Sequence, residues 1–149
     1  MKTVGIIGLG YVGLPLACEF WRAGCRVIGV DLDEDKIRLL TKGNSYVQDV
    51  SSTLLGSMLD SGRFLATKYY EELRLAEAVI ICVQTPLRKT QEPDISIVAD
   101  VSKRLAKILQ RGQIVVLEST VFPGATEEVV APLLNESGLE AGVEFSLAF

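Results

Sequence analysis

The glycine-rich segment near the amino terminus constrains the fold of this chain more than any other feature. An apolar run over residues 3–7 leads into Gly8-Leu9-Gly10-Tyr11-Val12-Gly13, and an apolar, helix-like run follows. A strand, a GxGxxG turn and a helix in this order form the phosphate-binding turn of a dinucleotide fold. The first glycine allows the sharp bend, the second lets a pyrophosphate approach the backbone, and the third lets the helix pack against the strand.

An acidic residue at a suitable distance supports this interpretation over a chance glycine-rich turn. The apolar run over residues 25–30 ends in Asp31, which stands 18 residues after Gly13. The dinucleotide fingerprint has an acid about 20 residues on, where its carboxylate accepts hydrogen bonds from the adenosine ribose. That carboxylate would also repel a 2′-phosphate, so the sequence favours NAD over NADP. Lys36 and Arg38, close downstream, weaken this preference only slightly.

Composition limits the class of protein. The chain has 149 residues, 48% of them hydrophobic and 23% charged, which suits a single globular domain with a substantial core. A net charge of −4 without a basic run argues against a nucleic-acid partner. The first apolar run is far shorter than the ~20 residues of a membrane span, and no secretory signal precedes it. We therefore expect a cytoplasmic protein without a membrane segment.

Few side chains are available for acid–base or nucleophilic chemistry. The chain contains no histidine, which removes the commonest general base and every Ser-His or Cys-His nucleophile. Cys18, Cys25 and Cys82 form no CxxC pair and are expected to be reduced thiols in the core. No metal site is expected, because no histidine can complete one.

Strands and helices alternate along the chain. Strands are expected at about residues 3–8, 26–31, 63–67, 78–83, 114–117 and 143–149. Two helices are expected over about residues 11–23 and 34–43, a third begins after a Ser51 cap, and a short one ends at Leu75. A long helix is expected from an Asp94 cap to about residue 110, after a polar loop over 88–93, and the last begins near Ala125. This order predicts an α/β, doubly wound, Rossmann-type fold, mostly parallel, with six strands in the order 3-2-1-4-5-6 and one domain over residues 1–149.

Three segments are expected to meet at one edge of this sheet, because ligands of such folds bind beyond the carboxyl ends of the strands. They are the turn over residues 8–13, the segment Val83-Gln84-Thr85-Pro86-Leu87 after the fourth strand, and Glu118-Ser119-Thr120 after the fifth. Thr85 offers a hydroxyl, and Pro86 ends the strand. Alternatively, Thr85 and Pro86 only terminate the strand, and Ser119 and Thr120 only cap the entry to the last helix.

Longer stretches around these segments resemble a known family. The runs GLGYVGLPLA (8–17), CVQTPL (82–87) and ESTVFPGATEE (118–128) are similar in order and spacing to UDP-glucose/GDP-mannose dehydrogenases, over essentially the whole chain. The resemblance is to the amino-terminal, NAD-binding domain, so the central and substrate-binding domains are expected to be absent from this fragment. The last run is similar to the branch acting on UDP-N-acetylglucosamine or UDP-N-acetylmannosamine. UDP-glucose enzymes more often have Lys in place of Glu118, and Gln84 departs from the Pro or Asn of the family.

The resemblance implies a reaction and a set of roles. The family oxidises the C6 alcohol of a nucleotide sugar to a carboxylate in two hydride transfers to NAD, through a thiohemiacetal and a thioester of a cysteine. By resemblance, Asp31 and Lys36 bind the adenosine ribose, Thr85 lines the cofactor, and Thr120 holds the active-site water near the nicotinamide. The catalytic cysteine and lysine belong to later segments, and a catalytic glutamate would follow Phe149. The fragment is therefore expected to bind NAD without turnover.

The expected site and its alternatives can be stated together. The expected cofactor-binding residues are Gly8, Gly10, Tyr11, Val12, Gly13, Asp31, Lys36, Val83, Thr85, Pro86, Ser119 and Thr120, with Thr120 also catalytic. By resemblance, the full-length protein binds a UDP-sugar, forms a homo-oligomer and supplies precursors of surface polysaccharides. The alternatives are a UDP-glucose 6-dehydrogenase, a 3-hydroxyacid-type dehydrogenase that oxidises once, and a non-catalytic NAD-sensing module.

Overall fold

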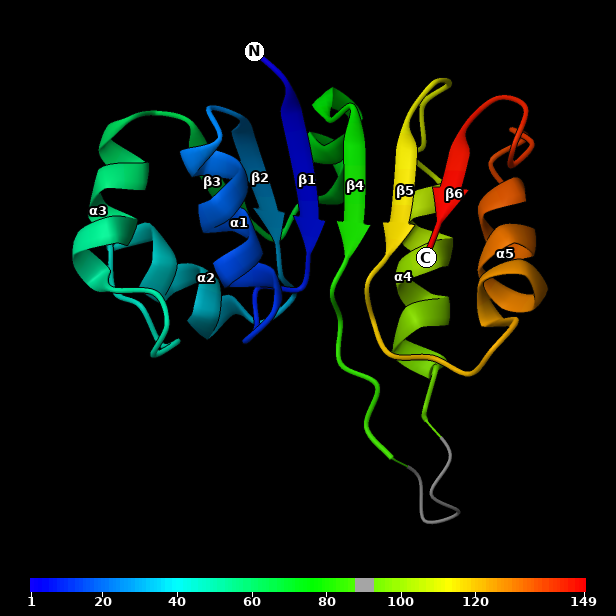
Figure 1. Cartoon of the computed structure of the whole chain (residues 1–149), viewed down its shortest axis with the longest axis horizontal. Coiled ribbons are helices and arrows are strands. Elements are labelled where there is room, and N and C mark those ends of the chain that lie inside the picture. Colours follow the sequence, from blue (N-terminus) through cyan, green and yellow to red (C-terminus); the bar gives the residue numbers. More distant parts are fainter. Residues whose placement is uncertain (88–92) are drawn as a thin grey trace.

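Six parallel strands form one sheet at the centre of the molecule (Figure 1). The computed structural model describes residues 1–87 and 93–149, so most of the polar loop expected at 88–93 lies outside the described residues. The strands are β1 (Thr3–Ile7), β2 (Arg26–Val30), β3 (Phe64–Thr67), β4 (Ala78–Ile81), β5 (Ile114–Leu117) and β6 (Ser146–Ala148). Their order, β3-β2-β1-β4-β5-β6, confirms the predicted doubly wound topology.

Helices cover both faces of the sheet. They are α1 (Gly13–Arg22), α2 (Glu34–Thr41), α3 (Ser52–Asp60), η1 (Tyr70–Leu75), α4 (Ser96–Ala106), η2 (Thr126–Val130) and α5 (Ala131–Asn135). Successive strand residues point to opposite faces, so Ile6 packs with apolar residues of α1, α2 and α3, whereas Ile7 packs with those of η1, α4 and α5. Two apolar cores thus enclose one buried sheet, as is usual for parallel strands.

Side chains cap the starts of two helices. The Asp33 carboxylate accepts hydrogen bonds from the backbone N–H groups of Asp35 (2.9 Å) and Lys36 (3.2 Å) at the start of α2. The Ser51 hydroxyl accepts one from the Leu54 N–H (3.1 Å), which confirms the expected cap of α3. Asp94 is not the cap of α4: the cap position is Ile95, and the Asp94 carboxylate accepts from the Ser96 N–H at 3.0 Å.

Several element boundaries differ from the prediction for local reasons. β1 ends before Gly8, whose φ of 92° is incompatible with a strand, and α1 begins at Gly13 rather than at residue 11. β4 ends at Ile81, and α4 ends at Ala106, although Ile108 and Leu109 are still buried. Of the three cysteines, Cys18 is buried, whereas Cys25 and Cys82 are half-buried, so the expectation of core thiols holds fully for Cys18 alone.

The last helix contains a wide turn that the sequence did not predict. Residues of η2 form a π-helix, and α5 follows it with Pro132 in its first turn. Pro132 has no N–H to donate to the Glu128 carbonyl four residues before it, and a wider turn accommodates the missing bond. The effect of Pro132 on this helix is thus a π turn.

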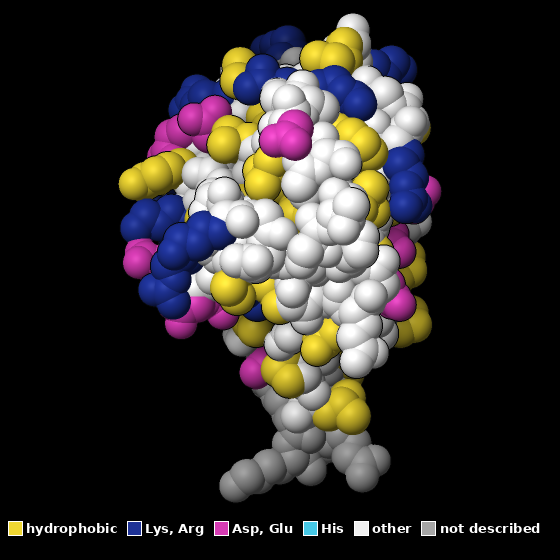
Figure 2. Space-filling model, turned by 90° about the vertical axis from the view of Figure 1, so that its left-hand side faces the viewer, with side chains coloured by type: hydrophobic (Ala, Val, Ile, Leu, Met, Phe, Trp, Pro, Cys, Tyr) yellow, Lys and Arg dark blue, Asp and Glu magenta, His cyan; other side chains and the backbone are white. Residues whose placement is uncertain are grey.

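The outer flank of the sheet carries mixed charge. Figure 2 views the molecule from the side of α3 and shows Lys and Arg side chains in separate groups, several beside Asp or Glu, with no continuous basic patch on this face. Around α2, ion pairs link Lys68 to Glu34 and Arg38 to Asp35. Among the described residues, no helix is long and apolar enough to cross a membrane.

Gln113 provides a test of the fold away from the site. Its buried amide donates to the carbonyls of Leu73 (2.9 Å) and Ala76 (2.7 Å) and accepts from the Gln110 N–H (2.8 Å). Gln113→Leu removes all three bonds and leaves the Leu73 carbonyl with only the Ala76 N–H as a donor, so we expect the free energy of unfolding in urea to fall by about 2–4 kcal/mol. Gln48→Leu, on the exposed surface, should change it by less than ~0.5 kcal/mol. Equal stabilities of the two variants would contradict this role.

Candidate cofactor site

The turn between β1 and α1 requires glycine at its first and last positions. A Cβ on Gly8 would lie 2.7 Å from the Cys82 carbonyl oxygen, and one on Gly13 would lie 1.8 Å from the Gly8 carbonyl oxygen. The Gly8 N–H donates to the Val30 carbonyl at 2.8 Å, which ties the turn to the neighbouring strand. These two glycines therefore shape the turn by packing.

The middle glycine has a different role, because it faces open space. A Cβ on Gly10 would meet no heavy atom within 4 Å. Within the described chain no side chain caps α1, and Tyr11 and Val12 beside the turn are exposed. The amino end of a helix carries roughly half a positive charge and free N–H groups, which suit an anion. The open space at Gly10 beside this helix end, called the cradle below, fits the pyrophosphate of a dinucleotide.

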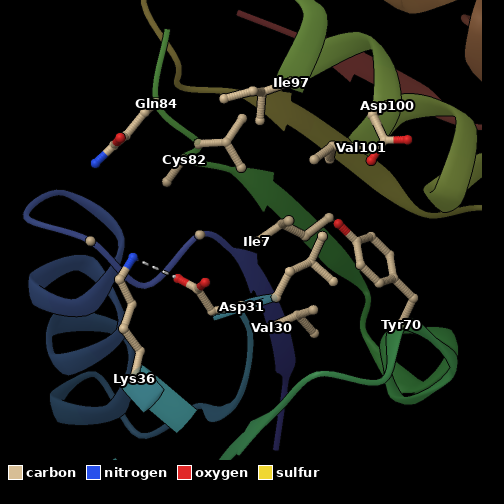
Figure 3. Close-up of a pocket in the computed structure, with 14 residues that line it drawn as sticks. Ile7, Val30, Asp31, Lys36, Tyr70, Cys82, Gln84, Ile97, Asp100 and Val101 are labelled. Carbon is tan, nitrogen blue, oxygen red and sulfur yellow. Dashed lines mark hydrogen bonds and ion pairs between the residues drawn. The ribbon is translucent and has the colours of Figure 1, made fainter. Parts of the chain in front are cut away.

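Asp31 lies at the tip of β2, beside the turn. Its Oδ2 atom forms an ion pair with Lys36 Nζ at 3.3 Å (Figure 3). The same Oδ2 atom accepts a hydrogen bond from the Leu9 N–H (2.9 Å), and the Oδ1 atom accepts one from the Asp33 N–H (3.0 Å). The structure thus brings together Asp31 and Lys36, the two residues expected to bind the adenosine ribose. The bond to Leu9 was not foreseen, because motif spacing does not show which oxygen faces which backbone group.

Two pockets meet beneath the turn. The first, of about 190 Å³, includes Asp31 and Lys36, and the second, of about 410 Å³, includes Thr85 and Thr120. Both pockets are lined by Gly10, Cys82, Val83 and Gln84. A ligand with two halves joined at Gly10 fits this arrangement, which lies where the strand order reverses between β1 and β4.

The far wall of the first pocket comes from residues that the sequence analysis did not assign. Figure 3 shows Tyr70, Ile97, Asp100 and Val101, from η1 and α4, across from Asp31. Ile97 shares its helical spacing with the buried Val101 and Leu105, yet it is 41% exposed at the pocket. Helical periodicity marks the apolar face of α4, but it cannot distinguish a core contact from the wall of a cavity.

The ends of β4 and β5 form the second pocket. The Ser119 hydroxyl lies 2.8 Å from the Val83 carbonyl oxygen and 3.3 Å from that of Ile81, and it donates to them. Through these bonds the buried Ser119 side chain joins the ends of β4 and β5. Thr85 is half-buried at the pocket, and Thr120 is exposed there. All of the expected residues from both segments, Val83, Thr85, Pro86, Ser119 and Thr120, line this pocket. Their contact with a cofactor remains a prediction.

Cys82 lies between the two pockets but is not activated. Burial, and secondarily the charge of Glu118, raises the pKa of its thiol to about 12. The thiol is therefore protonated near neutral pH, whereas the thiolate is the nucleophilic form. Over residues 1–87 and 93–149, no three side chains of His, Cys, Asp or Glu lie close enough together to hold a metal ion.

Comparison with known proteins identifies the family. A model described as the NAD-binding domain of the UDP-glucose/GDP-mannose dehydrogenase family matches residues 2–149. The chain belongs to this family. NAD is accordingly the cofactor of this domain, and the cradle at Gly10 and the carboxylate of Asp31 fit it.

Individual relatives match the family domain over almost all of this chain. The UDP-N-acetyl-D-mannosamine dehydrogenase of Pyrococcus horikoshii is 35% identical over 146 residues, which are 97% of this chain and 35% of that protein. The UDP-N-acetyl-D-glucosamine 6-dehydrogenase of Pseudomonas aeruginosa is 35% identical over 95% of this chain and 33% of its own length. A crystal structure of GDP-mannose dehydrogenase from Pseudomonas aeruginosa superposes with a TM-score of 0.91 and 33% identity, covering 99% of this chain and 35% of that chain. The chain thus spans about a third of these relatives.

Alanine substitutions can separate the two kinds of glycine in the turn. Gly10→Ala fills the cradle without touching the protein, so we expect NAD binding to weaken about tenfold or more while the free energy of unfolding changes by less than ~1 kcal/mol. Gly13→Ala collides with Gly8 and should also lower the free energy of unfolding by about 1–3 kcal/mol. Calorimetric titration and urea denaturation measure the two effects. Gly10→Ala binding NAD like wild type would contradict the placement of the pyrophosphate.

Proposed function

We propose that this chain is the cofactor domain of a longer NAD-dependent nucleotide-sugar 6-dehydrogenase. In this proposal the enzyme oxidises the C6 alcohol of a UDP-N-acetylhexosamine to the uronic acid. The observation that carries the proposal is the pair of pockets joined at Gly10, with Asp31 on one side and Thr120 on the other, in a member of this family. The intact protein would be a cytoplasmic homo-oligomer without nucleic-acid or membrane partners.

The residues of the two pockets would bind and orient the cofactor. Asp31 would accept hydrogen bonds from the adenosine ribose, and the amino end of α1 would face the pyrophosphate. NAD supplies a hydride acceptor, and the second pocket would hold its nicotinamide beside the exposed hydroxyl of Thr120. That hydroxyl would position the water molecule that is consumed when the aldehyde, the product of the first oxidation, is converted to the acid.

The covalent step requires a cysteine from outside the described residues. Oxidation of an alcohol to a carboxylate removes two hydrides and adds one water, so two NAD are reduced for each sugar. Among the described cysteines, only Cys82 lines either pocket, and its raised pKa keeps it protonated. Cys18 is buried, and its pKa is raised by desolvation. The nucleophile therefore belongs to another part of the proposed longer protein.

The assignment to UDP-N-acetylhexosamines is supported by the printed names of two relatives and by Glu118. One relative acts on UDP-N-acetyl-D-mannosamine and the other on UDP-N-acetyl-D-glucosamine. Glu118 is exposed and lines the second pocket, at a position where the UDP-glucose branch more often has lysine. A GDP-mannose enzyme is equally similar overall, so the sugar must be tested directly.

The reaction is tested on the intact protein with a panel of nucleotide sugars. We expect NAD reduction with a UDP-N-acetylhexosamine and two NADH for each sugar consumed. Turnover with UDP-glucose alone would keep the family and overturn the choice of sugar. NAD binding without turnover on any sugar would overturn the dehydrogenase and favour an NAD-sensing module.

Removal of the Asp31 carboxylate tests the cofactor assignment. Asp31→Ala loses the acceptor for the ribose hydroxyls and leaves the Leu9 N–H without its partner, so we expect the dissociation constant of NAD to rise about 10- to 100-fold. The preference for NAD over NADP should fall as well, because the repulsion of a 2′-phosphate is gone. Asp49→Ala removes an exposed carboxylate elsewhere and should change neither value. Unchanged NAD affinity in Asp31→Ala would refute the assignment.

A further inference from the structure

Leu9, between the first two glycines of the turn, is held from both ends. Its N–H donates to Asp31 Oδ2 at 2.9 Å, and its carbonyl accepts a hydrogen bond from the Tyr46 hydroxyl at 2.5 Å. Its side chain is fully buried, and a Cβ added to Gly29 would lie 2.7 Å from a Leu9 methyl carbon. The backbone that enters Gly10 therefore has little freedom to rotate.

The segment that carries Tyr46 is itself fixed. It connects α2 to α3, where the Ser45 N–H donates to Ser52 Oγ at 3.1 Å. The Ser45 hydroxyl accepts from the Val47 N–H at 3.2 Å and donates to the Val47 carbonyl at 3.1 Å. Val47 and Val50 are buried in the core under α1 and α3. Tyr46 is thus presented to the turn by a loop with its own hydrogen bonds and apolar anchors.

Tyr46 acts on the turn as a hydrogen-bond donor. Burial, followed by the charges of Asp31 and Asp33, raises the pKa of its hydroxyl, so the proton is retained near neutral pH. Tyr46 is not among the residues that line either pocket, in contrast to Gly10, which lines both. The hydrogen bond to the Leu9 carbonyl is the contact that links Tyr46 to the turn.

The geometry of the peptide bond determines what that contact controls. The Leu9 carbonyl and the Gly10 N–H belong to one planar trans peptide, so they point in opposite directions. When Tyr46 holds the carbonyl on the side of α2 and α3, the direction of the Gly10 N–H is set as well. A donor aimed in advance at an anion binds it without the cost of ordering.

We propose that Tyr46 is a positioning residue for NAD, which orients the Gly10 peptide toward the pyrophosphate by holding the Leu9 carbonyl. The proposal rests on the NAD site of the proposed function and deepens it. It makes a distinct claim, because Tyr46 should affect the phosphate-bearing part of the ligand and leave the adenosine part alone.

Tyr46→Phe on the intact protein tests this proposal, since it removes the hydroxyl and keeps the ring. We expect the dissociation constants of NAD and ADP to rise about three- to tenfold, as for the loss of one hydrogen bond, and that of adenosine to stay unchanged. Calorimetry measures the first two, and an NMR titration measures adenosine. In turnover assays KM for NAD should rise while kcat is retained.

Controls distinguish positioning from support of the fold. Tyr69→Phe removes an exposed hydroxyl near β3 and should bind all three ligands like wild type. If Tyr46→Phe weakens adenosine as much as ADP, or leaves NAD affinity unchanged, the positioning role is overturned. If the wild-type protein does not bind NAD, the proposed function fails together with this inference, and that outcome is recognised before any variant is made.

Discussion

The hydrogen bond between the Leu9 N–H and the Asp31 carboxylate is the contact on which the site depends. It joins the ends of β1 and β2, so the residue proposed to bind the ribose also fixes the turn proposed to face the pyrophosphate. A carboxylate accepting a backbone N–H is a charge-assisted bond, stronger than a neutral one. The turn after β1 and the tip of β2 consequently form one rigid unit of protein.

The rest of the structure supports that unit from both faces of the sheet. On one face, Leu9 and Tyr46 are held above the core formed with α1, α2 and α3. On the other, η1 and α4 supply the far wall of the first pocket, and Ser119 joins the ends of β4 and β5 beside the second. The two pockets therefore lie on either side of the point where the strand order reverses between β1 and β4, and Gly10 lines both of them.

Sequence reasoning was successful where a rule of geometry links residue type to backbone. Gly8 and Gly13 were predictable because only glycine fits, and the strand order followed from the alternation of strands and helices. Contacts between distant segments were not predictable, since neither Tyr46 nor Ile97 belongs to a motif. The π turn before Pro132 was not predictable either, because proline excludes a regular helix without dictating its replacement.

The protonated thiol of Cys82 has a consequence for chemical selectivity. The proposed oxidation passes through an aldehyde, and thiolates add readily to aldehydes. A reactive thiolate in the floor shared by both pockets would divert that intermediate into a dead-end adduct. Burial and the neighbouring carboxylate of Glu118 keep Cys82 in its inert form, so a soft, polarisable side chain can pack beneath the glycine turn without entering the reaction.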